Sequence, residues 1–221
     1  MGIAMQAIIL DIDVLYFCCF RKVTSNSLIL TYLIPPFTTV RGLLANVLGY
    51  KRDDLNLQEA IKIGIIVQDF GTKNTELAKI LKLKKDPKRK KSPDYPSSPM
   101  FKEYLVQPRY KVFIGGDQNI MGKIDTSLQN CSRPVYLGQS DDLIDIKKSE
   151  IMPAEQVDTD IINSSVSEFV EDSIMEKVPF KFSGDGKSLE YKIVCIPMQQ
   201  KARLKTTIKA YKISDYFVEL F

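Results

Sequence analysis

The stretch TYLIPPFTTVRGLLANVLG, residues Thr31–Gly49, decides the fold. It begins apolar and extended, stops at Pro35-Pro36, and restarts as a helix behind Thr38 and Thr39, where a threonine hydroxyl can cap the first free N–H groups. Gly49 can take the left-handed turn that ends such a helix. One apolar stripe at helical spacing then faces the core, formed by Val40, Leu43, Leu44, Val47 and Leu48. The stretch therefore predicts a short, amphipathic helix after an extended segment.

Arg41 places a cation in the first turn of this helix. The helix macrodipole disfavours positive charge there by roughly 0.3–1 kcal/mol. One interpretation is a bound anion, on which free N–H groups and the guanidinium would converge. The other is an ordinary solvated arginine, which is the commoner case.

Three segments of the sequence resemble one known family and occur in the same order as in that family. The first is Phe20-Arg21-Lys22 followed by the stretch above; the others are KEYLVQPRYKVFIGG at Lys102–Gly116 and RPVYLGQSDDL at Arg133–Leu143. Together they are similar to the CRISPR-associated Cas-five family, which belongs to the RAMP superfamily of type I Cascade complexes. The resemblance covers about Ala7–Asp145, and beyond it the chain is similar only in general character.

Charge is distributed unevenly along the 221 residues, although the net charge is only +4. Residues 141–176 hold eleven Asp/Glu against two Lys, whereas the part before them is basic. Residues 1–140, which are basic, suit a polyanionic partner, whereas the acidic residues 141–176 would repel one. We therefore expect nucleic acid to lie along residues 1–140.

Cysteine usage and the apolar runs predict a cytoplasmic protein without a metal site or cofactor. The four cysteines form no C-x-x-C pair, and there is no histidine to complete a zinc site. We expect all four to be small core residues in a reducing compartment. The apolar run Val14–Phe20 is too short to span a bilayer.

Periodicity predicts an α+β fold that opens with a half-buried strand at Ala7–Tyr16. The order of elements favours a ferredoxin-like (RRM/RAMP-type) βαββαβ domain at residues 1–140, with an inserted thumb at about 71–102. Residues 141–221 would form an acidic connector and a small, mostly β region. The other expected elements are strands at Ile61–Val67, Lys102–Ile114 and Val135–Leu137, a turn or two of helix at Leu77–Leu83, a helix at Asn119–Gln129, and a hairpin of Val178–Phe182 with Leu189–Ile196.

The inserted thumb is rich in lysine, arginine and proline. Prolines at 87, 93, 96 and 99 oppose regular structure, so we expect an exposed basic loop. Such runs are usually solvated, but the position matches the thumb of the resembled family, which favours nucleic-acid contact. The candidate contact residues are Lys84, Lys85, Lys88, Arg89, Lys90 and Lys91.

The resemblance implies a non-catalytic, RNA-binding subunit of a Cascade complex in antiviral defence. Such a subunit grips and caps the 5′ handle of the CRISPR RNA, contacts the backbone (Cas-seven) and large (Cas-eight) subunits, and helps to position the guide for target DNA. Single-stranded RNA calls for cationic phosphate contacts and aromatic stacking. The candidates are Arg21, Lys22 and Arg41 for phosphate, with Lys111 second to them, Tyr32 and Tyr136 for stacking or hydroxyl contacts, and Gly138 for a close backbone approach. Cys19 stands where many family members carry a histidine, which weakens any transfer of detailed base contacts.

Two enzymatic alternatives stay open from the sequence. Some members of the family cut the CRISPR repeat without a metal, and Tyr32, Tyr110, Lys22 and Lys111 are the residues that could take part here. The other alternative is a metal-dependent, palm-like nucleotidyl enzyme, because Asp11-Ile12-Asp13 and Gly115-Gly116-Asp117 lie at the places where palms hold metal ions.

Overall fold

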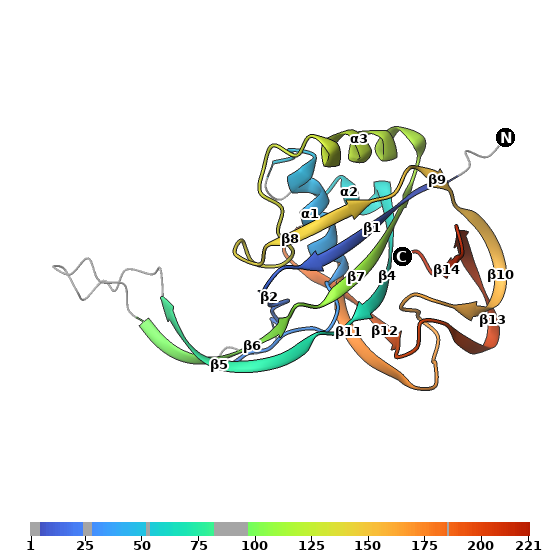
Figure 1. Ribbon diagram of the computed structural model, residues 1–221. Coiled ribbons are helices and arrows are strands. Elements are labelled where there is room, and N and C mark those ends of the chain that lie inside the picture. The colour runs from blue at the N-terminus through green and yellow to red at the C-terminus, as the bar shows by residue number, and fades with distance from the viewer. Residues whose placement is uncertain (1–4, 24–27, 52–53, 82–96, 185) are drawn as a thin grey trace.

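The computed structural model describes residues 5–23, 28–51, 54–81, 97–184 and 186–221. It is a strand-rich α+β fold (Figure 1). The helices are α1 (Phe37–Val47), α2 (Leu57–Ala60) and α3 (Gln118–Gln129). The strands are β1 (Gln6–Val14), β2 (Phe17–Cys18), β3 (Leu28–Ile29), β4 (Ile61–Asp69), β5 (Thr72–Leu81), β6 (Ser97–Val106), β7 (Arg109–Gly116), β8 (Ile144–Lys148), β9 (Met152–Pro153), β10 (Glu155–Ile162), β11 (Ser173–Phe182), β12 (Leu189–Pro197), β13 (Ala202–Ile213) and β14 (Tyr216–Val218).

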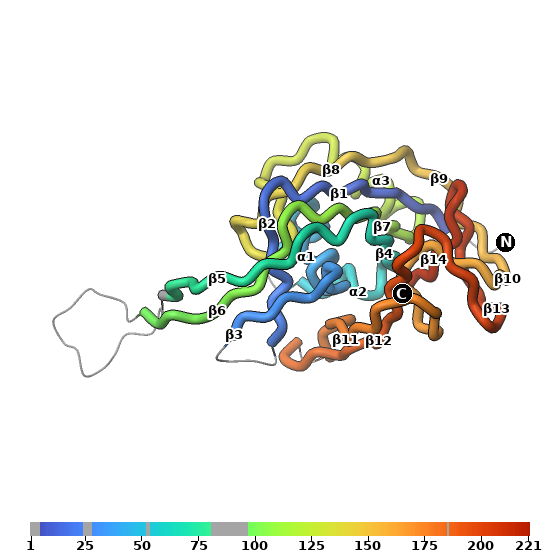
Figure 2. Tube along the Cα trace, turned by 60° about the horizontal axis from the view of Figure 1, so that its bottom comes forward, coloured from blue at the N-terminus to red at the C-terminus, as the bar shows by residue number. Residues whose placement is uncertain are grey.

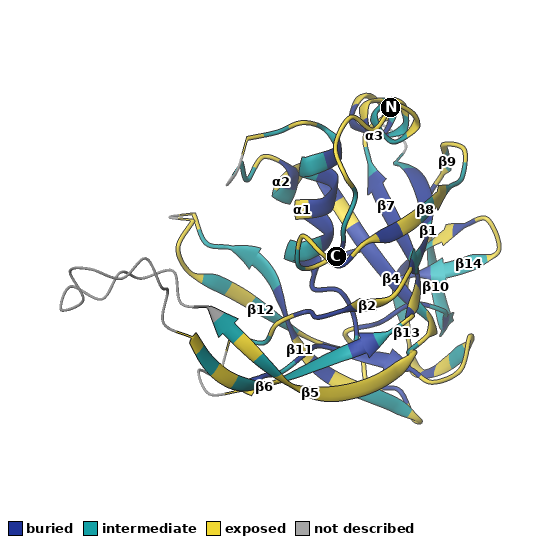
Figure 3. Cartoon of the chain, turned by 60° about the vertical axis from the view of Figure 1, so that its left-hand side comes forward, coloured by how far each residue is buried: buried dark blue, intermediate teal, exposed yellow. Residues whose placement is uncertain are grey.

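The central sheet has the strand order β4-β7-β1-β8, and every pair in it is antiparallel. The predicted alternation along β1 is confirmed: Ile8, Leu10 and Ile12 belong to the main core, which also holds the apolar side of α1. Ile9 points to the other face, where a second apolar cluster includes Val218 of β14. Figure 3 shows the buried residues gathered between the sheet and α1.

Helix α1 forms as the sequence predicts, but its first turn is not capped as expected. It begins after Pro35-Pro36, and no side chain caps its N-terminus, so neither Thr38 nor Thr39 plays that role. Gly49 does take the left-handed conformation, with a φ of 73°. The buried face of the helix includes Val40, Leu43, Leu44 and Val47.

The strand that closes the sheet is β8, and the prediction of Val135–Leu137 is wrong. Residues 136–143 instead form a turn, in which Tyr136 makes only an isolated bridge to Leu143. The buried carboxylate of Asp142 holds this turn, because it accepts the N–H groups of Cys19 and Gln139 at 3.0 and 2.8 Å. The sheet therefore extends past residue 140, where the sequence placed the domain boundary.

Strands β5 and β6 form a long hairpin that projects from the body of the molecule (Figures 1 and 2). The predicted helix at Leu77–Leu83 is wrong, because the described residues up to Leu81 pair in antiparallel register with β6. The predicted strand Lys102–Ile114 is two strands, since Gln107 takes a φ of 50° between them. The candidate contacts Lys84, Lys85, Lys88, Arg89, Lys90 and Lys91 lie outside the described residues.

The C-terminal region contains the predicted hairpin, as β11 and β12. Val178, Val194 and Ile196 of this hairpin enter the main core. The acidic strand β10 lies beside the basic strand β13, so its charges face partners within the chain, as in the Arg203–Asp160 ion pair at 3.1 Å. Among the described helices, none is long and apolar enough to cross a membrane.

Candidate nucleic-acid interface

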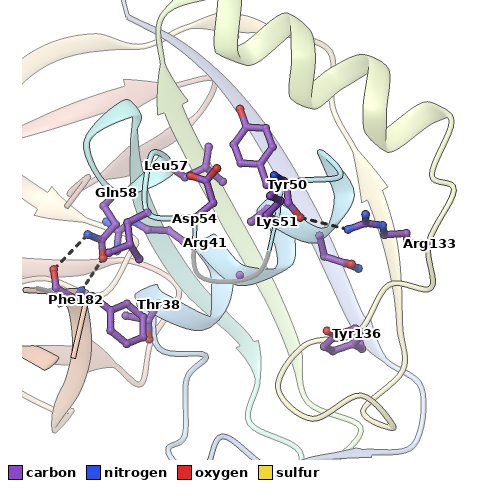
Figure 4. Close-up of a pocket in the computed structure, with 15 residues that line it drawn as sticks. Thr38, Arg41, Tyr50, Lys51, Asp54, Leu57, Gln58, Arg133, Tyr136 and Phe182 are labelled. Carbon is purple, nitrogen blue, oxygen red and sulfur yellow. Dashed lines mark hydrogen bonds between the residues drawn. The ribbon is translucent and has the colours of Figure 1, made fainter. Parts of the chain in front are cut away.

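A pocket of about 570 Å³ runs along one face of α1 (Figure 4). The helix contributes five residues that share a face because they are three or four residues apart: Thr38, Arg41, Gly42, Ala45 and Asn46. Three other segments complete the wall: the 50–58 segment that includes α2, the loop from Arg133 to Tyr136, and the tip of the β11–β12 hairpin at Phe182 and Gly186.

Arg41 is buried in this pocket, with only 5% of its surface exposed. One guanidinium nitrogen, Nη1, donates to the carbonyl oxygen of Phe180 on β11, and the guanidinium lies 5.2 Å from the Phe180 ring centre. Nε and Nη2 have no hydrogen-bond partner among the described residues. Burial lowers the pKa of Arg41 to about 10, so the group stays charged at neutral pH. The pocket therefore contains a buried cation with two unused donors, which is a costly arrangement in the absence of an anion.

Two more cations, Lys51 and Arg133, line the pocket beside Arg41. Lys51 is exposed, and Arg133 donates to the Tyr50 carbonyl at 3.5 Å. Asp54 is the one carboxylate among the lining residues. The three cations therefore outnumber the single anion, and the pocket favours a negatively charged ligand.

The hairpin wall of the pocket is fastened to the helices by side chains. The Gln58 amide pairs twice with the backbone of Phe182, accepting from its N–H at 2.6 Å and donating to its oxygen at 3.2 Å. Lys181 forms an ion pair with Glu59 at 2.7 Å. With the Arg41 bond to Phe180, these contacts hold three successive residues of β11 against α1 and α2.

Of the predicted stacking residues, Tyr136 lines the pocket and Tyr32 does not. Tyr32 is 3% exposed, and the Lys22 ammonium lies 4.9 Å from its ring centre, so the ring has no face open to a base. The prediction of Tyr32 as a stacking residue is therefore wrong. Tyr32 belongs to the main core, and the next residue, Leu33, donates its N–H to Glu176 of the β11–β12 hairpin.

The predicted phosphate residues Arg21 and Lys22 lie outside the pocket lining. Arg21 is exposed at an isolated bridge to Thr31. Lys22 is paired with the nearly buried carboxylate of Glu176 at 2.7 Å, and Glu176 also accepts the N–H of Leu33 at 2.9 Å. Lys22 thus fastens β11 to the N-terminal segment, which the sequence did not anticipate.

Lys111 lies on the face of the central sheet opposite α1. It is paired with Asp11, and its ammonium is 5.5 Å from the centre of the Tyr216 ring. It therefore cannot act with Arg41 on one phosphate. Of the carboxylates in the palm hypothesis, Asp11 is thus held by Lys111, and Asp117 caps α3 by accepting the N–H of Ile120 at 2.8 Å.

Gly138 makes a close approach within the protein rather than toward a ligand. Its φ is 118°, and a Cβ built on it would lie 2.7 Å from Oδ2 of Asp142 and 3.3 Å from the oxygen of Cys19. Burial raises the pKa of Asp142, and its Oδ1 has no partner among the described residues. The 136–143 turn therefore accounts for the glycine at this position, and the contact of Gly138 with RNA stays a prediction.

The sequence missed Tyr50, Lys51, Gln58, Arg133 and Phe180 as parts of this interface. Arg133 opens a segment that resembles the family, which is the one signal that singled it out. The others come together only through the packing of the hairpin on α1.

Comparisons with known proteins agree with the resemblance seen in the sequence. Two solved structures have a similar fold: a CRISPR RNA-guided surveillance complex (15% identity, 91% of each chain covered, TM-score 0.56) and a CRISPR protein from Archaeoglobus fulgidus (11% identity, 96% of this chain and 97% of that chain, TM-score 0.58). No curated protein sequence gives a match. A family model described as CRISPR-associated protein (Cas_Cas5) matches residues 14–188, which is most of the chain. The protein therefore belongs to the CRISPR-associated Cas-five family.

Proposed function

We propose that the protein is an RNA-binding subunit of a type I CRISPR surveillance complex, and that it holds and caps the 5′ handle of the CRISPR RNA. The observation that carries this proposal is Arg41, a buried guanidinium with two unpaired donors in the wall of a pocket that Lys51 and Arg133 also line. A phosphate is the ligand that such a group binds best, because it can accept two parallel hydrogen bonds from the guanidinium fork.

The chemistry of the pocket also suits RNA in its single-stranded form. Tyr50, Tyr136 and Phe182 lie among the lining residues, and aromatic rings bind unpaired bases by stacking. Cations beside aromatic rings are the combination that proteins use for single strands. The family supports the same ligand, as does the RNA-guided complex among the similar folds.

We further infer that β1, α1, β4, β7, α3 and β8 form a ferredoxin-like unit, the fold expected for this superfamily. The chain order βαββαβ, the sheet order β4-β7-β1-β8 and the antiparallel pairing of every neighbour support this assignment. The β5–β6 hairpin is then an insertion between the second and third strands, at the position of a thumb. In the assembled complex we expect it to meet target DNA and the neighbouring backbone and large subunits.

Binding without cleavage is the favoured role because the residues available for metal-independent chemistry are engaged elsewhere. Tyr110 is buried, donates to the Leu33 carbonyl at 3.0 Å, and has a pKa raised well above its ordinary value by burial. Burial raises the pKa of Tyr32 to about 12. Lys22 and Lys111 are each paired with a carboxylate. None of these four is among the lining residues of the pocket.

The test is to purify the protein from cells that express a CRISPR repeat and to sequence any RNA that remains bound. We expect a short RNA of uniform 5′ sequence. Labelled repeat RNA is then incubated with the protein, in EDTA and in Mg²⁺, and resolved on a denaturing gel. We expect binding and no product. A discrete cut that disappears on a tyrosine or lysine substitution would favour the endoribonuclease alternative, and a cut that requires Mg²⁺ would favour the metal-dependent one.

A further inference from the structure

Three phenylalanine rings form a cluster at the start of α1. Phe37, the first residue of the helix, is fully buried, and Phe221 is 9% exposed. The Phe37 ring centre lies 5.7 Å from that of Phe180 on β11 and 5.1 Å from that of Phe221, with interplanar angles of 85° and 69°. Edge-to-face contacts at these distances are favourable. Phe37 therefore connects Phe221 to Phe180.

The cluster includes the residue that holds Arg41. Phe37 and Arg41 lie four residues apart on α1, so their side chains project from the same side of the helix. Phe180 contacts both of them, because its ring meets Phe37 and its carbonyl oxygen accepts a hydrogen bond from Nη1 of Arg41. The guanidinium also lies 5.2 Å from the centre of the Phe180 ring. The position of Phe180 therefore determines where the guanidinium is held.

The backbone of Phe221 is paired with β4 of the central sheet. Its N–H donates to the Ile63 oxygen at 3.0 Å, and its oxygen accepts the Ile63 N–H at 2.9 Å. The adjacent Gly64 allows this approach, because a Cβ on it would lie 2.9 Å from the Glu219 oxygen and 3.1 Å from the Leu220 side chain. Phe221 is therefore fixed to the sheet, and its ring supports Phe37 from there.

Lys192 of β12 contacts two of the same rings. Its ammonium lies 4.3 Å from the centre of the Phe221 ring and 5.4 Å from the centre of the Phe180 ring. A cation is attracted to the face of an aromatic ring. Lys192 thus favours the arrangement in which Phe180 and Phe221 stay close together.

We propose that Phe221 is a positioning residue for RNA binding, which keeps the Arg41 guanidinium in the pocket wall through Phe37 and Phe180. This inference rests on the proposed RNA-binding function and adds a residue outside the pocket lining on which affinity depends. A buried guanidinium with two unpaired donors gains hydration when it moves to the surface, so only its contacts with Phe180 hold it in place. A guanidinium already in position binds a phosphate more tightly, because less side-chain entropy is lost on binding.

The test is Phe221→Leu, which keeps an apolar side chain in the core and removes the ring. Binding of labelled repeat RNA to the full-length variant is measured by fluorescence anisotropy, at a temperature where thermal unfolding shows the variant to be folded. We expect binding about 5-fold weaker than that of the wild type, which is within the range of couplings between residues in contact. In the Arg41→Ala background the same substitution should leave the affinity unchanged, because the group that Phe221 positions is gone. A loss of stability alone would not depend on Arg41 in this way.

Phe113→Leu is the matched control. Phe113 is fully buried on the face of the central sheet opposite α1, where its ring makes a similar edge contact with Tyr216 at 5.4 Å between ring centres. The substitution should lower the temperature of unfolding to a similar degree and leave the affinity for RNA unchanged.

Each outcome decides the proposal. Wild-type affinity in Phe221→Leu overturns it, as does an equal loss of affinity in the presence and in the absence of Arg41. An equal loss in Phe113→Leu also overturns it, because the effect would then follow from stability alone. In these cases the proposed RNA-binding function stands, whereas failure of the wild type to bind repeat RNA refutes that function and this inference together.

Discussion

Replacing Arg41 by alanine is the change that best separates a bound anion from a structural cation. From the sequence alone, the substitution should leave stability unchanged or improve it slightly, because the macrodipole disfavours a cation in the first turn. The structure reverses that expectation. The guanidinium donates a hydrogen bond to the Phe180 carbonyl, and a bond from a charged donor stabilises the fold by about 1.5–3 kcal/mol. It also lies over the Phe180 ring, and this cation–π contact adds about 0.5–1 kcal/mol of stability.

The cost of keeping a buried charge with two unpaired donors offsets part of this loss. We therefore expect Arg41→Ala to lower the free energy of unfolding by about 1–2 kcal/mol, which is within the ordinary range for a point substitution. Urea denaturation gives this value directly, and the variant should stay folded at the temperature of a binding assay.

The effect on RNA is measured through its salt dependence. Each phosphate neutralised on a single strand contributes about 0.7 to the slope of log affinity against log salt. Loss of the Arg41 contact should reduce the slope by that amount, so that between 50 and 200 mM salt the wild type loses about 2.6-fold more affinity than the variant. The weakening at low salt should depend little on sequence.

The matched control must remove one positive charge away from the pocket. Lys51, which lies just beyond the end of α1, is unsuitable because it lines the same pocket. Lys123 is exposed on α3 and is absent from that lining, so Lys123→Ala changes the net charge equally. If the two variants lose the same slope and the same affinity, Arg41 contributes only to net charge and the anion site does not exist.

Three further predictions concern the parts of the chain around this site. Gly138→Ala should destabilise the protein by about 1–3 kcal/mol in urea denaturation, because its φ of 118° and the 2.7 Å approach to Asp142 both oppose a side chain; no change in stability would show that the turn relaxes freely. Burial raises the pKa of Asp142 above its unfolded value near 3.8, so the stability that this group contributes is present below pH 3.8 and is lost as the pH rises through the raised pKa. Urea denaturation between pH 4 and 7 should therefore show a free energy of unfolding that includes this loss with rising pH in the wild type, and Asp142→Asn should lack it. Replacing residues 82–96 by a short Gly-Ser linker should leave the thermal unfolding of the described core unchanged, while assembled complexes should bind target DNA more weakly; unfolding on this change would place the segment in the core.

The elements that the sequence predicted well are those whose signals are local. Helix α1 carries its own apolar stripe, its leading prolines and its terminal glycine. The sequence of the β11–β12 hairpin has two apolar segments separated by glycines, and these segments pair as strands. The elements that it missed depend on distant pairing. Strand β5 has no strong strand pattern of its own and becomes a strand by pairing along its whole length with β6. The closing strand was misplaced because the Asp142 carboxylate, bound to the backbone of Cys19 far back in the chain, turns residues 136–143 out of the sheet.

The sequence predicted one residue of the candidate site, Arg41, but it did not predict the pocket that this residue lines. The argument from the macrodipole singled out Arg41, and Arg41 does line a pocket whose cations favour an anion. The premise of that argument was wrong, because α1 begins at Phe37 and Arg41 lies beyond its first turn. The sequence could not show that Arg41 is buried, because the residue that buries it, Phe180, lies 139 positions later. For the same reason the sequence assigned Lys22 and Tyr32 to RNA. In the structure Lys22 pairs with Glu176 of β11, and Tyr32 is buried in the core.

The β11–β12 hairpin, to which the sequence assigned no site, determines the geometry of the pocket. Arg41, Gln58 and Glu59 each hold one of three consecutive residues of β11, and Phe182 of that strand forms the wall facing α1. An anion bound by Nε and Nη2 of Arg41 would leave Nη1 on the Phe180 carbonyl, so one guanidinium would join the ligand to the hairpin. Since the hairpin also enters the main core through Val178 and Val194, RNA bound in the pocket should stabilise the C-terminal region together with the sheet. The two halves of the chain are therefore expected to unfold as one unit, and to do so at a higher temperature when RNA is bound.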